Sequence, residues 1–213
     1  MTCHPGKSFV KMDAEASRLL AAARLSVDEI VPGQFFVSGK RGAADFSALQ
    51  QRGITHIVNC SSQLKEGALE NYHDDTLEYY RLSLEDTPQC PLLSLLPAAL
   101  EWAQDAIASG GVVLAHCNAG SSRSGAFAVA FLMQTQGLTY ADALAAARDA
   151  RPTIAPNAGF RAHLRAFQQT VDGAPPAAPP APEEIAADAQ EFADAAMITR
   201  MGRGEEWGEV NLH

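Results

Sequence analysis

A cysteine and an arginine lie six positions apart, at Cys117 and Arg123, between an apolar run and a helical pattern. Residues 111–115 (GVVLA) are typical of a short buried strand, and residues 124–134 (SGAFAVAFLMQ) are typical of a buried helix. The residues between them are therefore predicted to form a strand-to-helix turn. In such a turn successive main-chain N–H groups point inward and can bind an anion.

These residue types favour phosphoryl transfer. Inward amides, the positive end of a helix and a guanidinium all favour a thiolate, so we expect Cys117 to be ionised at neutral pH and to act as a nucleophile. Arg123 can hold two oxygens of a phosphoryl group while charge redistributes during transfer. Ser124 can donate a hydrogen bond to the sulfur, which helps the thiolate to leave when a phospho-cysteine is hydrolysed.

The rest of the turn is predicted to bind the phosphate. Gly120 allows the backbone to curl tightly, and the small neighbouring side chains leave the interior open. This hypothesis requires a thiol that solvent can reach and a hollow between it and the guanidinium. His116 is expected to orient the turn rather than to transfer protons, and we predict neither a metal nor a cofactor. The predicted phosphate-binding residues are Asn118, Ala119, Gly120, Ser121, Ser122 and Arg123.

The sequence HCNAGSSRS at residues 116–124 resembles the HCxxGxSRS signature of the dual-specificity branch of the cysteine-dependent protein tyrosine phosphatases. The resemblance covers about residues 26–170 and implies a phosphatase-like α/β fold in a small, atypical member of the branch. It is carried by further segments at residues 28–39 and 49–60, which resemble the opening strands and first helix, and at residues 138–167, which resemble the closing helices and contain RPTIAPNAGF.

The resemblance also implies a carboxylic acid that protonates the leaving group, on a loop upstream of the cysteine. Residues 82–88 (LSLEDTP) lie at the expected distance, and the family position favours Asp86 over Glu85. Consecutive residues of an extended segment point in opposite directions, so only one of the two can face the site. Because Cys117 must be deprotonated while Asp86 is protonated, we predict a mildly acidic activity optimum.

Three further residues carry alternative interpretations. In relatives, the asparagine that corresponds to Asn157 braces the phosphate loop, and the arginine that corresponds to Arg151 can bind a second anion. Either side chain can instead satisfy main-chain groups of its own loop. Cys60 ends a predicted strand, so it is either a buried strand cysteine or the partner of Cys117 in a reversible disulfide.

Composition narrows the class of protein. The chain has 213 residues, 47% of them hydrophobic, without an apolar run of membrane-spanning length or a signal-peptide pattern at the start. The four cysteines are irregularly spaced, which argues against a disulfide framework and favours a reducing compartment, the cytoplasm or the nucleus. The net charge is -9, so we expect neither nucleic acid nor an anionic membrane as a partner.

Strand and helix patterns alternate, which predicts an α/β domain with a central, mainly parallel sheet flanked by helices. Strands are expected at residues 56–59, 77–82 and 112–116, and helices at residues 45–51 and 95–108 and near Ser124, Tyr140 and Asn157. We divide the chain into an N-terminal extension with a weak helix (1–25), a catalytic domain (26–172), a Pro/Ala linker (173–184) and an acidic tail (185–213). A helix over residues 183–201 can dock on the domain, bind a partner or stay disordered.

The predicted function is hydrolysis of phosphomonoesters on protein Tyr and Ser/Thr through a phospho-cysteine intermediate, with a phosphorylated protein as partner. One alternative is the same chemistry on a phosphoglucan or a phosphoinositide. The loop contains no lysine, which makes an inositol phospholipid a weaker candidate. The other alternative is a non-catalytic phosphate-binding scaffold, because the family includes members that have lost the nucleophile.

Overall fold

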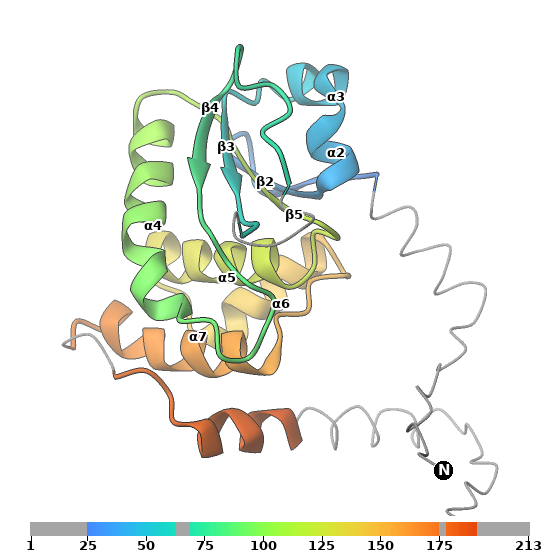
Figure 1. The fold of residues 1–213 in the computed structure, drawn as a ribbon. Coiled ribbons are helices and arrows are strands. Elements are labelled where there is room, and N and C mark those ends of the chain that lie inside the picture. Colours follow the sequence, from blue (N-terminus) through green and yellow to red (C-terminus); the bar gives the residue numbers. More distant parts are fainter. Residues whose placement is uncertain (1–24, 63–68, 175–177, 191–213) are drawn as a thin grey trace, which may run out of the picture.

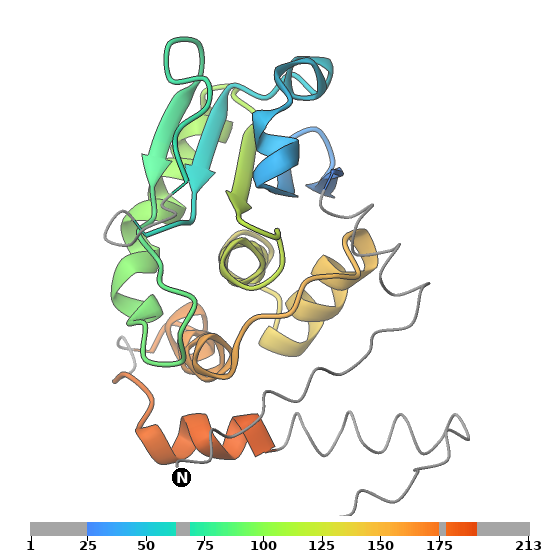
Figure 2. The same cartoon turned by 45° about the vertical axis from the view of Figure 1, so that its right-hand side comes forward.

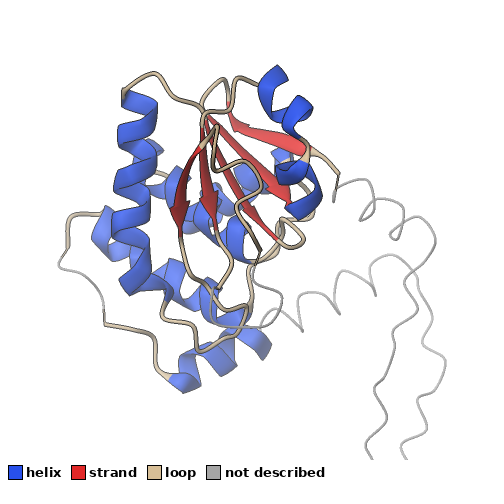
Figure 3. Cartoon of the chain, turned by 45° about the horizontal axis from the view of Figure 1, so that its top comes forward, coloured by secondary structure: helices blue, strands red, loops and turns tan. Residues whose placement is uncertain are grey.

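The computed structural model describes residues 25–62, 69–174 and 178–190. A five-stranded sheet runs through this part of the chain, with helices against both of its faces (Figures 1 and 3). The strand order is β1-β2-β5-β3-β4. The strands are β1 (Val27–Val31), β2 (Phe35–Gly39), β3 (His56–Asn59), β4 (Glu78–Arg81) and β5 (Val113–Cys117).

The sheet is mixed but mainly parallel, as predicted. Only the edge strand β1 runs antiparallel to its neighbour β2, and the β2–β5, β5–β3 and β3–β4 pairs are all parallel. The carboxyl ends of four strands therefore meet at one edge. At that edge Gly39 of β2 is paired with Cys117 of β5, so the turns that follow these two strands lie side by side.

Six labelled helices connect and cover the strands. The larger layer contains α4 and α5 against the sheet, with α6 and α7 packed on α5, while α2 and α3 follow β2 on the other face (Figure 1). The helices are α2 (Lys40–Ala44), α3 (Phe46–Gln51), α4 (Leu92–Ala108), α5 (Arg123–Gln136), α6 (Tyr140–Ala150) and α7 (Ala158–Val171).

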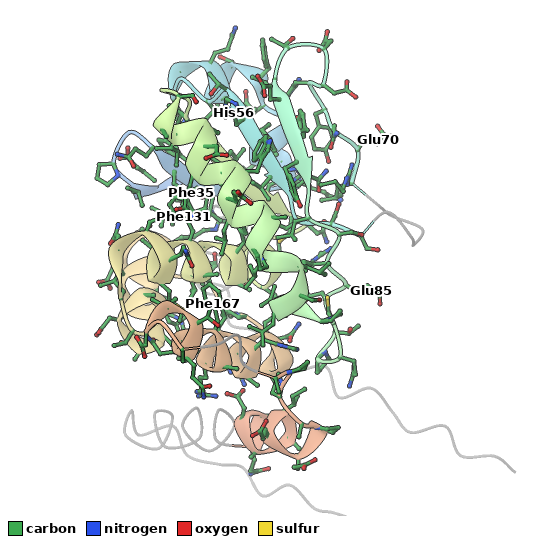
Figure 4. All side chains as sticks on the ribbon, turned by 90° about the vertical axis from the view of Figure 1, so that its left-hand side faces the viewer. Phe35, His56, Glu70, Glu85, Phe131 and Phe167 are labelled. Carbon is green, nitrogen blue, oxygen red and sulfur yellow. The ribbon has the colours of Figure 1, made fainter. Side chains whose placement is uncertain are left out.

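Side chains alternate along β5 between two apolar clusters. Val113 and Ala115 belong to the cluster beneath α4 and α5, and Leu114 belongs to the cluster beneath α2 and α3. In the larger cluster the ring of Phe35 stacks on that of Phe131 of α5, with centroids 4.5 Å apart (Figure 4). Burying a side chain such as Phe131 stabilises the fold by about 1.5–3 kcal/mol, so this contact anchors α5 to the sheet.

The helix α4 begins at Leu92, one turn before the predicted start at residue 95. In a helix that began at residue 95, Pro97 would lie in the first turn, where its missing N–H costs nothing. In the structure Pro97 lies inside the helix, and the additional turn buries Leu92 completely. The short helix α2 was not predicted, because its five residues are too few to show a periodic pattern.

The chain packs on the domain again from the last residues of the predicted Pro/Ala linker onward. Residues 182–190 are helical and lie alongside α7 (Figures 1 and 2). The carboxylate of Asp188 is buried there between Arg161, whose Nη2 is 2.6 Å from Oδ2, and Arg165. The weak helix predicted at residues 12–24, and the part of the predicted 183–201 helix that follows residue 190, lie outside the described residues. Within the described part of the chain, no helix is both long enough and apolar enough to span a membrane.

Candidate active site

Cys117 is the last residue of β5, and the loop that follows it turns directly into α5, which Figure 2 shows nearly end-on. Its sulfur accepts two hydrogen bonds, from the main-chain N–H of Gly120 at 3.2 Å and from the hydroxyl of Ser124 at 3.3 Å. Both donors favour negative charge on the acceptor. The predicted juxtaposition of Ser124 and the sulfur is therefore present.

The solvent exposure of Cys117 differs from the expectation. Its relative exposure is 2%, so the sulfur lies at the base of the loop rather than at an open surface. The reason is the fold itself, because Cys117 ends a central strand and its side chain joins the cluster beneath α4 and α5. Ser122 and Arg123, which are partly exposed, form the outer rim of the loop.

The carbonyl groups of residues 118–121 all face away from the inside of the loop. In order, they accept from the N–H of Lys40 at 3.1 Å, from Nη2 of Arg151 at 3.2 Å, from Nε of Arg151 at 2.7 Å and from the N–H of Ala155 at 3.2 Å. Carbonyl and N–H groups of a peptide chain that curls in one direction point to opposite sides. The outward carbonyls therefore leave the N–H groups to line an anion-binding cradle.

Gly120 is required at its position on two counts. Its φ of 70° lies in the left-handed region that side chains disfavour. A Cβ atom built there would also lie 2.5 Å from Nη2 of Arg151 and 2.6 Å from the carbonyl carbon and oxygen of Ser38. The backbone of the loop is thus pressed against β2 and the buried guanidinium, and only glycine fits.

Arg151 is completely buried and serves as a brace beneath the loop. Besides the two loop carbonyls, its guanidinium donates to Ser26 Oγ at 2.9 Å and forms an ion pair with Asp28. This arrangement differs from both alternatives for the residue: the guanidinium holds carbonyls of the cysteine loop rather than main-chain groups of its own loop, and its complete burial leaves no exposed face for a second anion. Sequence reasoning did not find Asp28 as the partner, because the two residues are 123 positions apart.

Arg123 opens α5 at the rim of the loop, with its side chain 17% exposed. Its Nε lies 3.7 Å from Oδ2 of Asp86, at the long end of an ion pair. Within the part of the chain that the structure describes, its guanidinium makes no hydrogen bond. The fork is therefore available to an anion that enters the cradle.

Asp86 comes to the same rim from the segment between β4 and α4. Its Oδ1 accepts from the hydroxyl of Ser122 at 2.6 Å and from Nδ2 of Asn157 at 3.0 Å, and its side chain remains 42% exposed. Glu85 lies on the same segment, at the edge of the molecule in Figure 4. Asp86 therefore lies beside the cysteine loop.

Asn157 links the acid to the end of the domain. It caps α7 by accepting from the N–H of Phe160 at 2.9 Å, its own N–H donates to Ser122 Oγ at 3.2 Å, and its amide nitrogen holds Asp86. Gly159 next to it packs so tightly on Pro88 that a Cβ would lie 1.9 Å from the Pro88 carbonyl oxygen. The start of α7 therefore fixes the position of the acid segment.

His116 points to the opposite face of the sheet from Cys117, where the ring of Tyr72 lies 6.2 Å away. The residue is fully buried, and burial lowers its pKa to about 3, with a smaller opposing effect from the main chain of Cys117. A ring that stays neutral in the interior agrees with a part in positioning the loop rather than in proton transfer.

Cys60 follows β3 and lies behind the loop, with its N–H bonded to the carbonyl of His116 at 2.8 Å. Burial, and next the nearby Cys117, raise the pKa of its thiol well above the ordinary value. Cys60, Cys90 and Cys117 are all free thiols in the structure.

Comparison with known proteins places most of this architecture in one family. Residues 35–170 match the model of the dual specificity phosphatase catalytic domain. Dual specificity protein phosphatase 19 of Mus musculus is 36% identical over 145 residues, which are 68% of this chain and 63% of the relative. The serine/threonine/tyrosine-interacting protein of Homo sapiens is 34% identical over 148 residues, 68% of this chain and 66% of the relative. The chain thus spans just under two thirds of the length of these relatives.

Comparison with solved structures agrees with this family assignment. The crystal structure of the human tyrosine phosphatase-like serine/threonine/tyrosine-interacting protein has a TM-score of 0.65 at 33% identity, covering 69% of this chain and 98% of that one. The structure of human DUSP28 has a TM-score of 0.61 at 28% identity, covering 68% and 95%. The α/β fold is therefore that of the tyrosine phosphatase-like proteins, and this chain belongs to the dual specificity phosphatase family.

Proposed function

We propose that this protein hydrolyses phosphomonoesters on phosphoproteins, at Tyr and at Ser/Thr, through a phospho-cysteine intermediate on Cys117. The observation that carries the proposal is the environment of the sulfur. It accepts hydrogen bonds from Gly120 and Ser124 at the base of a loop whose carbonyls are all turned outward. Such donors stabilise a thiolate, and the same cradle of N–H groups fits the oxygens of a phosphoryl group.

The first step transfers the phosphoryl group to sulfur. The Cys117 thiolate attacks phosphorus, an S–P bond forms, and the bond from phosphorus to the substrate oxygen breaks. Arg123 holds two of the other oxygens through its fork while their charge redistributes. Asp86 gives its proton to the departing oxygen, which becomes a neutral hydroxyl group.

The second step releases phosphate. Asp86, now a carboxylate, accepts a proton from a water molecule that attacks phosphorus, and the S–P bond breaks. The Ser124 hydroxyl, 3.3 Å from the sulfur, stabilises the thiolate as it leaves. In the unliganded arrangement Arg123 pairs loosely with Asp86, and an incoming phosphate competes for that guanidinium, which frees the acid to face the leaving group.

A protein substrate is favoured by the loop and by the chain as a whole. The residues between Cys117 and Arg123 include no lysine, and the net charge of -9 opposes approach to an anionic membrane. A phosphoinositide or a phosphoglucan substrate would need further contacts, which the loop itself does not provide.

A second candidate is a phosphate-binding protein without turnover. It is favoured by the names of several relatives, which describe interacting proteins rather than phosphatases. In this chain, however, the nucleophile, the guanidinium and the acid are present together at one loop. We therefore rank it second.

Hydrolysis of an aryl phosphate by the full chain and by Cys117→Ser separates the two candidates. We expect turnover by the wild type, a loss of about 10⁴-fold or more in the variant, and phosphopeptide binding that survives in it. Cys90→Ala is the matched control, because it removes a different buried thiol and should retain activity. Wild-type protein that binds a phosphopeptide without hydrolysing any phosphoester would overturn the enzymatic proposal in favour of the second candidate.

A further inference from the structure

Two cations lie beside the cysteine loop and take no part in the mechanism above. Lys40 and Arg41 follow β2 and form the start of α2. Together with Asn118 and Ala119 of the loop, they line a hollow of about 220 Å³. The hollow therefore borders both the cysteine loop and two residues with positive side chains.

The position of this pair relative to the loop is fixed by the main chain. Gly39 is the register partner of Cys117 in the sheet, and the N–H of Lys40 donates to the carbonyl of Asn118 at 3.1 Å. A Cβ atom on Gly39 would lie 3.2 Å from the main chain of Ala119. The turn from β2 to α2 and the cysteine loop thus form one packed unit.

Both cations are uncommitted. In the described residues, neither the Lys40 nor the Arg41 side chain has an ion pair or a hydrogen bond, and both residues are exposed. The acids that are nearby in the fold or the sequence are occupied, since Asp28 pairs with Arg151 and Asp45 caps α3. Two unpaired positive charges thus lie beside the phosphate loop, in a chain whose net charge is -9.

We propose that Lys40 and Arg41 form a second anion subsite, which binds a carboxylate or a second phosphate located near the phosphoresidue on the same peptide. This inference deepens the proposed function and rests on it for the identity of the first site. Arg41 supplies a planar fork and Lys40 a mobile point charge, a combination that accepts either anion. The subsite contributes to binding, because it is separate from the reacting atoms and from the acid.

A peptide is a better occupant than a lipid surface. Recognition of anionic membranes generally uses clusters of about four to eight basic residues, whereas this hollow holds two. A single neighbouring anion on a peptide needs no more than that. Lys40 and Arg41 would then select phosphopeptides of acidic sequence or with two phosphorylated residues.

The test compares three synthetic phosphopeptides: one with neutral neighbours, one with acidic neighbours and one with a second phosphate. For the wild type we expect kcat/KM to be about fivefold to tenfold higher for the two anionic peptides, and this preference should shrink at high salt. In Lys40→Gln/Arg41→Gln the preference should disappear through a higher KM at unchanged kcat. Hydrolysis of p-nitrophenyl phosphate, which has no second anion, should be unaffected.

The matched control is Gln134→Glu/Gln136→Glu, which changes the net charge by the same amount at the far end of α5 and should retain the preference. Binding of the same peptides to Cys117→Ser, with and without the double substitution, gives a readout that needs no turnover. A double variant that keeps its preference in both assays would overturn the subsite. Hydrolysis of p-nitrophenyl phosphate without any peptide preference would overturn it as well, and leave the proposed function standing.

An absence of hydrolysis in all assays would overturn the proposed function instead, and peptide binding would then decide the subsite alone. Vesicles with a phosphoinositide bisphosphate serve as the last arm. Vesicle binding that depends on Lys40 and Arg41, without an effect on the peptides, would also overturn the peptide subsite and assign the cations to a lipid headgroup.

Discussion

The cysteine loop and the segment that carries Asp86 meet at one site but are held in different ways. The loop is fixed through its main chain, by β2, by residue 155 and by the fully buried guanidinium of Arg151. Asp86 is held by three side chains, those of Ser122, Asn157 and Arg123, and remains 42% exposed. The phosphate cradle is therefore part of the folded core. The acid, in contrast, lies at the surface, and Asp86 can be substituted without unfolding the domain.

The largest effect should follow from adding one methyl group to the loop. In Gly120→Ala the new Cβ would meet Arg151 Nη2 at 2.5 Å and the Ser38 carbonyl at 2.6 Å, at a φ of 70°. We expect the free energy of unfolding to fall by about 3 kcal/mol and activity to drop by about 10²-fold or more. Chemical denaturation and aryl phosphate hydrolysis measure the two effects.

Gly137→Ala is the matched control for this substitution. Gly137 has a similar φ of 63°, but a Cβ built there meets nothing within 4 Å. Only the conformational strain remains, so we expect a loss of about 1 kcal/mol with activity retained. An equal decrease in the free energy of unfolding in the two variants would mean that the close approach of the loop to Arg151 and β2 does not contribute to stability.

A change at the acid should reduce turnover and leave stability alone. We expect Asp86→Asn to lower kcat for a phosphopeptide by about 10²-fold, and less for an aryl phosphate whose leaving group needs no proton. Glu85→Gln, one residue earlier, is the control and should retain activity. A larger loss in Glu85→Gln than in Asp86→Asn would reverse the assignment.

How much of the site could be predicted from the sequence depends on whether a contact is local or is made by distant segments of the chain. Cys117, Arg123 and Ser124 form a local sequence pattern. Their spacing, with a strand before the turn and a helix after it, already predicts which of their side chains lie close together. The packing around them is not local. Asp28 forms an ion pair with Arg151 although the two residues are 123 positions apart. The N–H of Lys40 bonds to the carbonyl of Asn118, and these residues follow two different strands. No short sequence pattern predicts either contact. For the acid, the sequence offered two adjacent carboxylates, and only family position favoured the one that the fold brings to the loop.

Burial was the hardest property to predict. The hypothesis asked for an accessible thiol, but a residue that ends a central strand inherits the burial of that strand, and Cys117 is 2% exposed. The start of α4 was also misplaced, because the helix begins at Leu92, which it buries completely, and tolerates Pro97 in its interior. Both differences arise from tertiary packing overriding local preference.

On the core side of the site, stability should depend on pH through His116. Burial lowers its pKa to about 3 in the folded protein, against 6.5 for an unperturbed histidine. Below pH 6.5 the unfolded chain therefore takes up a proton that the folded protein does not, and the free energy of unfolding falls as the pH drops from 6.5 toward 3. At pH 5 the loss from this residue is about 2 kcal/mol.

Denaturation of the wild type and of His116→Gln at pH 7.5 and pH 5 measures this contribution. The difference between the two pH values should be smaller in the variant by about 2 kcal/mol, whatever the variant's own stability. An unchanged difference would mean that the ring is solvated or paired in a way that the buried arrangement does not provide.

The smallest effect is expected at Asn157, which contacts both the acid segment and the folded core. Substitutions at this residue therefore test most finely how the two regions differ. Its Oδ1 accepts from Phe160 N–H as the cap of α7, and its Nδ2 donates to Asp86. Serine caps a helix about as well as asparagine but is too short to reach Asp86, so Asn157→Ser should keep its stability, whereas Asn157→Ala should lose about 1 kcal/mol. Both variants should lower kcat for a phosphopeptide by about fivefold to tenfold without raising KM. If activity instead followed stability, so that only the alanine variant lost turnover, Asn157 would act on the acid through the position of α7 and not through its amide, and the acid would belong to the core after all.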